Sequence, residues 1–316
     1  MATYDYTSMG FYTFDCLGWP FSAMPPGGGC YAIEELTLAV SGAAGTAAIA
    51  AAKMGLRTLA VGGVGDDLMG DWVLQRLAHF GVDTSAMQRE PGWKTSSSIV
   101  TTRRDGSRPA LHMSGATGNF RVPDAMLAQV VDATVFHAGG VGLMHAMDDG
   151  RTAELLRAAQ AAGAVTTVDV FAGSPHDMPA IATVLPFTDY FMPSIEEAQA
   201  LSGERDVAAA ADHFLARGAR ACVLTLGADG AYYRDWTGRT FHMPAFDVAV
   251  KCTCGCGDAF NAGFAVGIVK GFDLEATVRF AQATAALNAT GLGSQAGVQS
   301  FEHTLAFSRE APRKQR

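Results

Sequence analysis

The chain has 316 residues, of which 49% are hydrophobic and 17% are charged, and its formal net charge is −8. This composition supports one large α/β domain, or a domain with a small appendage, and excludes an intrinsically disordered protein. The acidic balance argues against nucleic acid as the main partner, because no lysine and arginine stripe offsets it and the basic residues 313–316 are few and terminal.

Two β-like stretches stand apart from the rest of the pattern. Residues 10–40 read as strands around a loop rich in Pro and Gly at 24–29. Residues 96–113 read as a hairpin with its turn at Asp105-Gly106. We expect these two stretches to pair into a small sheet, a lid formed by about 10–40 and 94–120. Lids of this kind exclude water from reactions that water would spoil.

From about residue 57, short apolar runs rich in β-branched residues alternate with helical patterns. This alternation is typical of a parallel sheet covered by helices on both faces, so we expect residues 1–316 to form a single domain into which the lid is inserted. Strands are expected at 58–61, 134–138, 165–169, 190–192 and 221–226, and helices at 68–80, 152–162, 196–201, 207–216, 258–270 and 274–290.

The N-terminus shows no secretory signal pattern, and the small-residue run 41–52 is too short and too weakly hydrophobic for a membrane span. We therefore expect a cytoplasmic protein without a membrane partner, in which the six cysteines are reduced thiols. Cys252, Cys254 and Cys256 alternate, but they lack the second ligand pair of a zinc site. We interpret them as small, weakly polar, buried residues.

The most informative segment is 250–264, where Gly255-Cys256-Gly257-Asp258 opens an amphipathic helix. The first amides of a helix are unpaired and carry partial positive charge, so they can hold a phosphate. A bound anion would repel Asp258, which therefore suits a base over a hydroxyl better than a phosphate ligand. Its alternative role is a helix cap. The segment indicates a phosphoryl-transfer site with its own general base.

Residues 255–264 resemble the C-terminal signature of the ribokinase-like (PfkB) carbohydrate kinases. Residues 61–70 and 81–84 are similar to N-terminal segments of that family, 194–197 to its Asn-x-x-Glu motif, and 225–230 to its nucleotide-side glycine turn. The resemblance covers nearly the whole chain. It implies a three-layer α/β/α sandwich with a central, mostly parallel sheet and a small β-sheet lid.

The resemblance also implies ATP-dependent transfer of the γ-phosphoryl group to a hydroxyl of a sugar or sugar derivative. Asp258 would be the base, and the amides of Gly255, Cys256 and Gly257 would form the anion hole. Glu197 would organise Mg²⁺, through water. The implied ATP side is Ser194, Glu197, Thr225, Gly227 and Gly230, and the implied substrate side is Asp15, Gly42 and Thr46.

Four departures from the family pattern stand out. Cys252-Thr253 replaces a frequent Asp-Thr whose aspartate helps to form a monovalent-cation site, which puts K⁺ activation in question. Ser194 replaces an asparagine, and residues 41–46 lack the first glycine and the asparagine of Gly-Gly-x-x-x-Asn. Asp169-Val170-Phe171 stands where many sugar kinases have Asp-x-Asn. A substrate pocket with fewer amide side chains and an added aromatic side chain suits a sugar other than the common substrates ribose and fructose.

The alternatives are a nucleoside kinase of the same family and a non-catalytic binding protein that kept the fold. A Rossmann dehydrogenase fits poorly, because Gly255-x-Gly257 is late and Phe260 takes the place of the third glycine; no P-loop motif occurs. Arg108 in the lid hairpin is either solvated or able to reach an anionic group. Exposed lid edges predict a homodimer formed through the lids.

Overall fold

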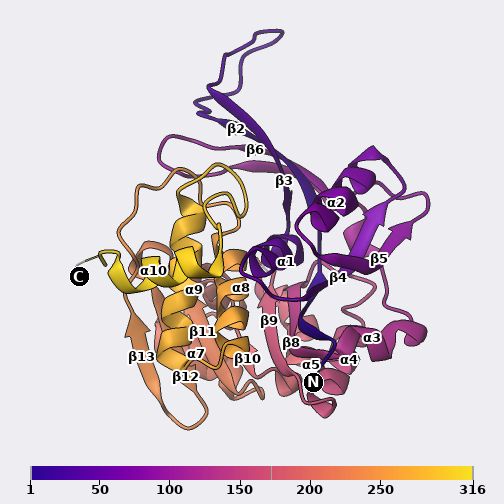
Figure 1. Cartoon of the computed structure of the whole chain (residues 1–316), viewed down its shortest axis with the longest axis vertical. Helices are drawn as coiled ribbons and strands as arrows, with labels where there is room; N and C mark the ends of the chain where they lie inside the picture. Colours follow the sequence, from indigo (N-terminus) through magenta and orange to yellow (C-terminus); the bar gives the residue numbers. More distant parts are fainter. Residues whose placement is uncertain (1, 172, 315–316) are drawn as a thin grey trace.

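The structure is a computed structural model that describes residues 2–171 and 173–314. Within these residues, a nine-stranded sheet forms the middle layer of the molecule (Figure 1). Its order is β13-β12-β11-β10-β9-β8-β1-β4-β5; the strands from β11 to β5 pair in parallel, and β12 and β13 are antiparallel additions at one edge. The expected mostly parallel central sheet is thereby confirmed. The bounds are β1 Tyr4–Gly10, β4 Thr58–Gly65, β5 Asp83–Glu90, β8 Ala133–Val141, β9 Val165–Val170, β10 Tyr190–Phe191, β11 Ala221–Thr225, β12 Ala231–Asp235 and β13 Thr240–Met243.

Helices cover both faces of this sheet because its strands send alternate side chains to opposite sides. In β4, Leu59 and Val61 enter the core under one helical layer, whereas Ala60 enters the core under the other. The first layer contains α3 Leu127–Val131, α4 Arg151–Ala161, α5 Met178–Val184, α6 Ile195–Ser202 and α7 Val207–Leu215. The second contains α1 Ala43–Lys53, α2 Leu68–His79, α8 Cys256–Val269, α9 Leu274–Ala289 and α10 Phe301–Glu310. No helix among the described residues is long and apolar enough to cross a membrane.

A second, four-stranded sheet projects from the main body (Figure 1). Its order is β3-β2-β6-β7, and it draws strands from both of the stretches expected to pair. Its strands are β2 Thr13–Trp19, β3 Glu35–Ser41, β6 Ser97–Thr101 and β7 Ala110–Met113. We call this sheet, with its β6–β7 hairpin, the lid.

The lid is joined to the main body at the β4–α2 junction. The carboxylate of Asp67 caps α2 by accepting from the amide of Gly70 at 2.9 Å. The same carboxylate accepts from the amide of Thr95 at 3.0 Å and from its hydroxyl at 2.7 Å. The Gly-Asp-Asp segment at residues 65–67 therefore fixes the point at which the chain re-enters the lid.

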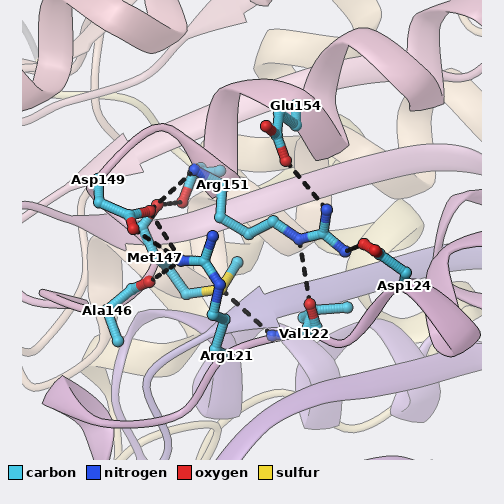
Figure 2. Close-up of polar contacts among 9 residues, drawn as sticks. Arg121, Val122, Asp124, Ala146, Met147, Asp149, Arg151 and Glu154 are labelled. Atoms are coloured by element: carbon cyan, nitrogen blue, oxygen red, sulfur yellow. Dashed lines mark hydrogen bonds and ion pairs between the residues drawn. The ribbon is translucent and has the colours of Figure 1, made fainter.

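The chain leaves the lid through residues 120–124, which a buried arginine fastens to α4 (Figure 2). Arg151 donates to the carbonyl of Val122 at 3.0 Å and forms ion pairs with Asp124 at 2.8 Å and Glu154 at 2.9 Å. The Arg151 side chain is buried while both carboxylates are exposed to solvent, so the hydrogen bond to Val122 is the most protected of these contacts. Both ends of the second lid segment are thus anchored.

Several elements were absent from the expected pattern. Helix α1 has nine buried residues among its eleven, so its small side chains show no polar face for a periodicity to detect. β5 is largely polar and lies at the sheet edge, and β12 and β13 form an antiparallel hairpin that parallel alternation does not predict. α10 was also missed, although Ser300 caps it through the amide of His303.

Candidate active site

A cavity of about 460 Å³ lies between the carboxyl ends of the parallel strands and the lid. Such crevices are the usual ligand sites of open α/β sheets. The main body contributes the ends of β9, β10 and β11 and the start of α8, and the lid contributes β2, β6, β7 and the hairpin between the last two. Eight of the predicted site residues line this cavity: Asp15, Gly42, Ser194, Glu197, Thr225, Gly255, Gly257 and Asp258.

The N-terminus of α8 presents open amides to the cavity. Gly255 caps the helix at a φ of 71°, where an added Cβ would lie 2.8 Å from the hydroxyl of Ser294. The backbone amides of Gly255 and Gly257 have no acceptor among the described residues, whereas that of Cys256 donates weakly to the carbonyl of Thr253 at 3.4 Å. Two of the three amides predicted for the anion hole are therefore free, and the third is partly engaged.

The space above Gly257 is large enough for a ligand group. A Cβ built on this residue meets no heavy atom within 4 Å. Neither backbone strain nor crowding therefore requires glycine at position 257, because an alanine side chain would fit here. The absent side chain leaves room beside two free amides at the positive end of a helix, a setting that suits an anionic phosphoryl group.

The carboxyl group of Asp258 occupies the same rim. Burial raises its pKa to about 6; the charge of Asp15 pushes in the same direction, while Arg108 and the hydroxyl of Thr46 oppose it. A base with a pKa close to the working pH is well matched to proton transfer. Asp258 is therefore mostly ionised at neutral pH and still basic enough to accept a proton.

Two residues outside the set of predicted site residues, Asp169 and Asn261, lie close to Asp258. Asp169, at the end of β9, lines the cavity and accepts a hydrogen bond from Nδ2 of Asn261 at 2.8 Å. Burial raises the pKa of Asp169 well above its usual value, and the charges of Glu197 and Asp258 add to that shift. Asn261 lies three residues after Asp258 on the same helix face, a spacing that could have revealed it.

Ser194 and Glu197 begin α6 as a capping box. The hydroxyl of Ser194 accepts from the amide of Glu197 at 3.2 Å, while Oε2 of Glu197 accepts from the amide of Ser194 at 3.0 Å and from its hydroxyl at 2.8 Å. The side chain of Ser194 therefore caps the N-terminus of α6. Thr225 stands beside Ser194 in a parallel bridge. Both residues line the cavity from the main body.

Four predicted residues lie outside the lining. Gly227 and Gly230 shape the turn beyond Thr225, and at Gly230 an added Cβ would overlap the carbonyl oxygen of Met243 at 2.0 Å. Thr46 is fully buried in α1 and acts on the site through the pKa of Asp258. The thiol of Cys256 turns away from the cavity and accepts from Nδ2 of Asn288 at 3.3 Å.

The lid side of the cavity carries Asp15, which is only 4% exposed. Its Oδ1 has no hydrogen-bond partner among the described residues, and burial raises its pKa. A buried carboxylate oxygen without a partner is costly unless a ligand completes it. The rings of Phe11 and Phe171 form an edge-to-face pair nearby, with centroids 5.8 Å apart, and both line the cavity.

The cysteines before α8 belong to a small apolar cluster rather than to the cavity alone. Cys252 and Cys254 are buried with residues of β2, β3 and β6, as expected for small core side chains, whereas Cys256 is half-buried. The thiol of Cys252 accepts from the amide of Cys254 at 3.4 Å and lies 3.6 Å from the hydroxyl of Thr102. Among the described residues, no group of three Asp, Glu, His or Cys side chains is arranged to hold a metal ion.

Comparison with known proteins assigns the chain to a family. The pfkB family carbohydrate kinase profile matches residues 27–300. The chain belongs to the pfkB family. Curated relatives of this pfkB protein include a 2-dehydro-3-deoxygluconokinase of Bacillus subtilis, 26% identical over 89% of this chain and 90% of the relative. A deoxyribokinase of Salmonella typhi is 27% identical over 88% of this chain and 90% of the relative.

Solved structures share the fold of this pfkB protein. An Escherichia coli protein assigned as ribokinase II, solved with ATP and Mg²⁺, superposes with a TM-score of 0.82 at 24% identity, over 96% of this chain and 99% of that one. The ribokinase of Arabidopsis thaliana, solved with ribose and ATP, gives a TM-score of 0.81 at 21% identity, over 98% and 99%. The expected ribokinase-like sandwich with its small second sheet is confirmed.

Proposed function

We propose that this pfkB protein is an ATP-dependent kinase that transfers the γ-phosphoryl group to a hydroxyl of a sugar or sugar derivative. One observation carries the proposal: two free amides and an open space over Gly257 lie beside the carboxylate of Asp258. An anion-holding cradle next to a base suits phosphoryl transfer to an alcohol.

The reaction follows from this arrangement. Asp258 takes the proton from the acceptor hydroxyl as its oxygen forms a bond to the γ-phosphorus. The bond from that phosphorus to the oxygen bridging it to the β-phosphorus breaks, and ADP leaves. The amides of Gly255 and Gly257, with a smaller contribution from Cys256, hold the charge on the transferring group. Asp15, with its free oxygen, orients the acceptor through its other hydroxyls.

The nucleotide is assigned to the part of the cavity lined by Ser194 and Thr225, next to the turn at Gly227–Gly230, which lies outside the lining. Two observations support this part: Ser194 and Thr225 line the cavity from the main body whereas Asp15 lines it from the lid, and the structural neighbours from E. coli and A. thaliana were solved with ATP. Gly42 and Thr46 remain assigned to the acceptor side, Gly42 at the cavity wall and Thr46 beneath Asp258.

Mg²⁺ fits the acidic part of the cavity. Glu197 and Asp169 both line it, and the charge of Glu197 helps to raise the pKa of Asp169, a shift that a cation bound nearby would oppose. Because described carboxylates form no closed metal site, Glu197 would hold Mg²⁺ through water, with Asp169 nearby. The ion would supply charge neutralisation for the phosphates.

We further propose that K⁺ does not activate this kinase. The position that often carries aspartate is Cys252, fully buried in the apolar cluster with Leu17 and Val100. A thiol is a poor ligand for a hard cation. Replacing KCl by NaCl at constant ionic strength should leave the turnover unchanged, whereas a several-fold activation by K⁺ would contradict this.

The decisive experiment is a screen of hexoses, ketoses, aldonates and nucleosides for ADP release, with Asp258→Asn as the matched control. We expect one sugar class to be phosphorylated, and the variant to lose at least about 10²-fold in turnover while remaining folded and binding ATP. Near wild-type turnover in the variant would remove Asp258 from the mechanism. Ligand binding without transfer in the wild type would favour a non-catalytic binding protein.

A nucleoside acceptor is the second candidate, since the Phe11–Phe171 pair could face a base and Phe171 is 52% exposed within the cavity. The same screen separates the two. A Phe171→Ala variant that no longer phosphorylates nucleosides but still phosphorylates sugars would favour the nucleoside assignment.

We also propose a homodimer formed through the outer faces of the lids. The strand register aligns Leu38, Cys16, Ile99 and Leu111 in one row across all four strands. Leu38, Ile99 and Leu111 in this row are 44%, 57% and 63% exposed, and Leu36 beside it is 65% exposed. A continuous apolar row on a small sheet favours burial against a second copy.

A further inference from the structure

The cavity contains four carboxylates and one permanent cation. Asp15, Asp169, Glu197 and Asp258 all line it. Among the described residues that line it, Arg108 is the only lysine or arginine, and its guanidinium forms no ion pair or hydrogen bond with any described residue. An arginine offers a planar set of donors suited to phosphate. Its side chain is therefore open to a ligand.

The lid hairpin that carries Arg108 is fastened to the loop before α8. Thr253 donates to the carbonyl oxygen of Gly106 from its backbone amide at 3.3 Å and from its hydroxyl at 3.1 Å. An added Cβ on Gly106 would lie 2.7 Å from a methyl group of Val250, so the two segments are closely packed. Lys251 contacts Glu35 of β3, which ties the same loop to another lid strand. We call the Gly106–Thr253 contact the latch.

The latch brings the charge of Arg108 to the rim of the anion hole rather than to the far end of the cavity. Arg108 opposes the rise in the pKa of Asp258, and the carboxylate of Asp258 in turn favours the charged guanidinium. Asp258 follows Gly257 directly in the first turn of α8, beside the free amides of Gly255 and Gly257. The anion that Arg108 meets is therefore the group held by those amides.

We propose that Arg108 is a further catalytic residue, which binds the transferring γ-phosphoryl group from the lid side while the latch holds the hairpin in place. This rests on the proposed kinase function. As the acceptor oxygen bonds to the γ-phosphorus, the bond to the bridging oxygen breaks and the proton passes to Asp258, so the charge on the phosphoryl oxygens lies between the α8 amides and Arg108. Thr253 is a positioning residue.

Arg108→Ala tests the proposal, and Arg103→Ala is the matched control, since Arg103 is an exposed arginine of the same hairpin outside the cavity lining. We expect Arg108→Ala to lower kcat by about 10²- to 10³-fold with little change in the acceptor KM, and Arg108→Lys to recover part of the loss. Binding of ADP with Mg²⁺ and aluminium fluoride, a mimic of the transferring group, should weaken in Arg108→Ala, while binding of ADP alone should not. Arg103→Ala should match the wild type.

The latch has its own variants. Thr253→Val keeps the side-chain shape but removes the hydroxyl donor, and should lower kcat several-fold without changing the affinity for ADP alone; Thr253→Ser should restore the rate. Unchanged kcat in Arg108→Ala overturns the proposal. A raised acceptor KM with unchanged kcat also overturns it, because Arg108 would then bind an anionic group of the acceptor. If the wild type phosphorylates nothing in the screen, the kinase proposal is wrong, and the proposed role of Arg108 is then wrong as well.

Discussion

Asn261 donates a hydrogen bond from Nδ2 to Oδ2 of Asp169 over 2.8 Å, and the two side chains are 2% and 7% exposed. This contact joins the first turns of α8 to the carboxyl end of β9. It also places a hydrogen bond where water scarcely reaches. The base Asp258 and the acid Asp169 are therefore held at a fixed spacing by one amide.

Removing that amide should damage both stability and turnover. Asn261→Ala leaves a buried carboxyl without its donor, which costs about 1–3 kcal/mol in the free energy of unfolding. We expect kcat to fall by about tenfold or more, because α8 loses its fixed relation to β9. Urea unfolding of both single variants and the double variant with Asp169→Ala measures the coupling. Additive effects would show that the contact carries no energy.

The pH dependence of kcat/KM should show an acidic limb near pH 6. Asp258 acts as a base only when ionised, and burial raises its pKa to about 6, so activity should fall as the pH drops below that value. Arg108 lowers this pKa and Asp15 raises it. Arg108→Ala should move the limb to higher pH and Asp15→Asn to lower pH. If the acidic limb of kcat/KM lies at the same pH in both variants as in the wild type, a group other than Asp258 titrates there.

Alanine at the two anion-hole glycines should have opposite effects on stability. Gly255 has a φ of 71° and little room, so Gly255→Ala should destabilise the fold by about 1–2 kcal/mol or more. Gly257 lies inside the first turn of α8 with open space around it, so Gly257→Ala should stabilise the fold by up to about 1 kcal/mol. The added methyl nevertheless takes the phosphoryl space, and turnover should fall at least tenfold. Wild-type turnover in a stabilised Gly257→Ala would contradict the assigned phosphoryl position.

The proposed dimer should depend on the apolar row of the lid. Ile99→Lys places a charge in the centre of that row and should give a monomer in light scattering at micromolar concentration. Trp236→Lys is the control, because Trp236 is 73% exposed but lies outside the lid, at the turn between β12 and β13. A wild-type protein that is monomeric under the same conditions would contradict the proposed dimer.

Most of the main body could be predicted from the sequence, because a parallel sheet covered on both faces produces long apolar runs separated by amphipathic helices. β9 and β11 follow that pattern and were found within one residue of their expected limits, whereas β4 and β8 begin near the expected residue and run three or four residues further. α1 and β5 could not be found in this way. α1 is buried almost all round, and β5 is an edge strand with a mostly polar surface.

The candidate site was predicted in part for a similar reason. Gly255, Gly257 and Asp258 stand next to one another in the sequence, so a local motif reveals them. Arg108 and Asp169 reach the same cavity from a lid hairpin and from the end of β9, and only tertiary contacts bring them to α8. The sequence placed Asp169 in a segment of the expected substrate pocket and Arg108 in the lid hairpin, but it did not indicate that either lies close to Asp258.

The lid is built from two segments that are far apart in the chain, with α1, β4, α2 and β5 between them. One edge of β2 therefore stays unpaired until β6 joins it, and the intervening chain contributes β4 and β5 to the central sheet. Contacts of such long sequence separation form slowly. During refolding, protection of the β2–β6 amides from hydrogen exchange should therefore appear after that of the β1–β4 amides, whose partners lie closer in the sequence.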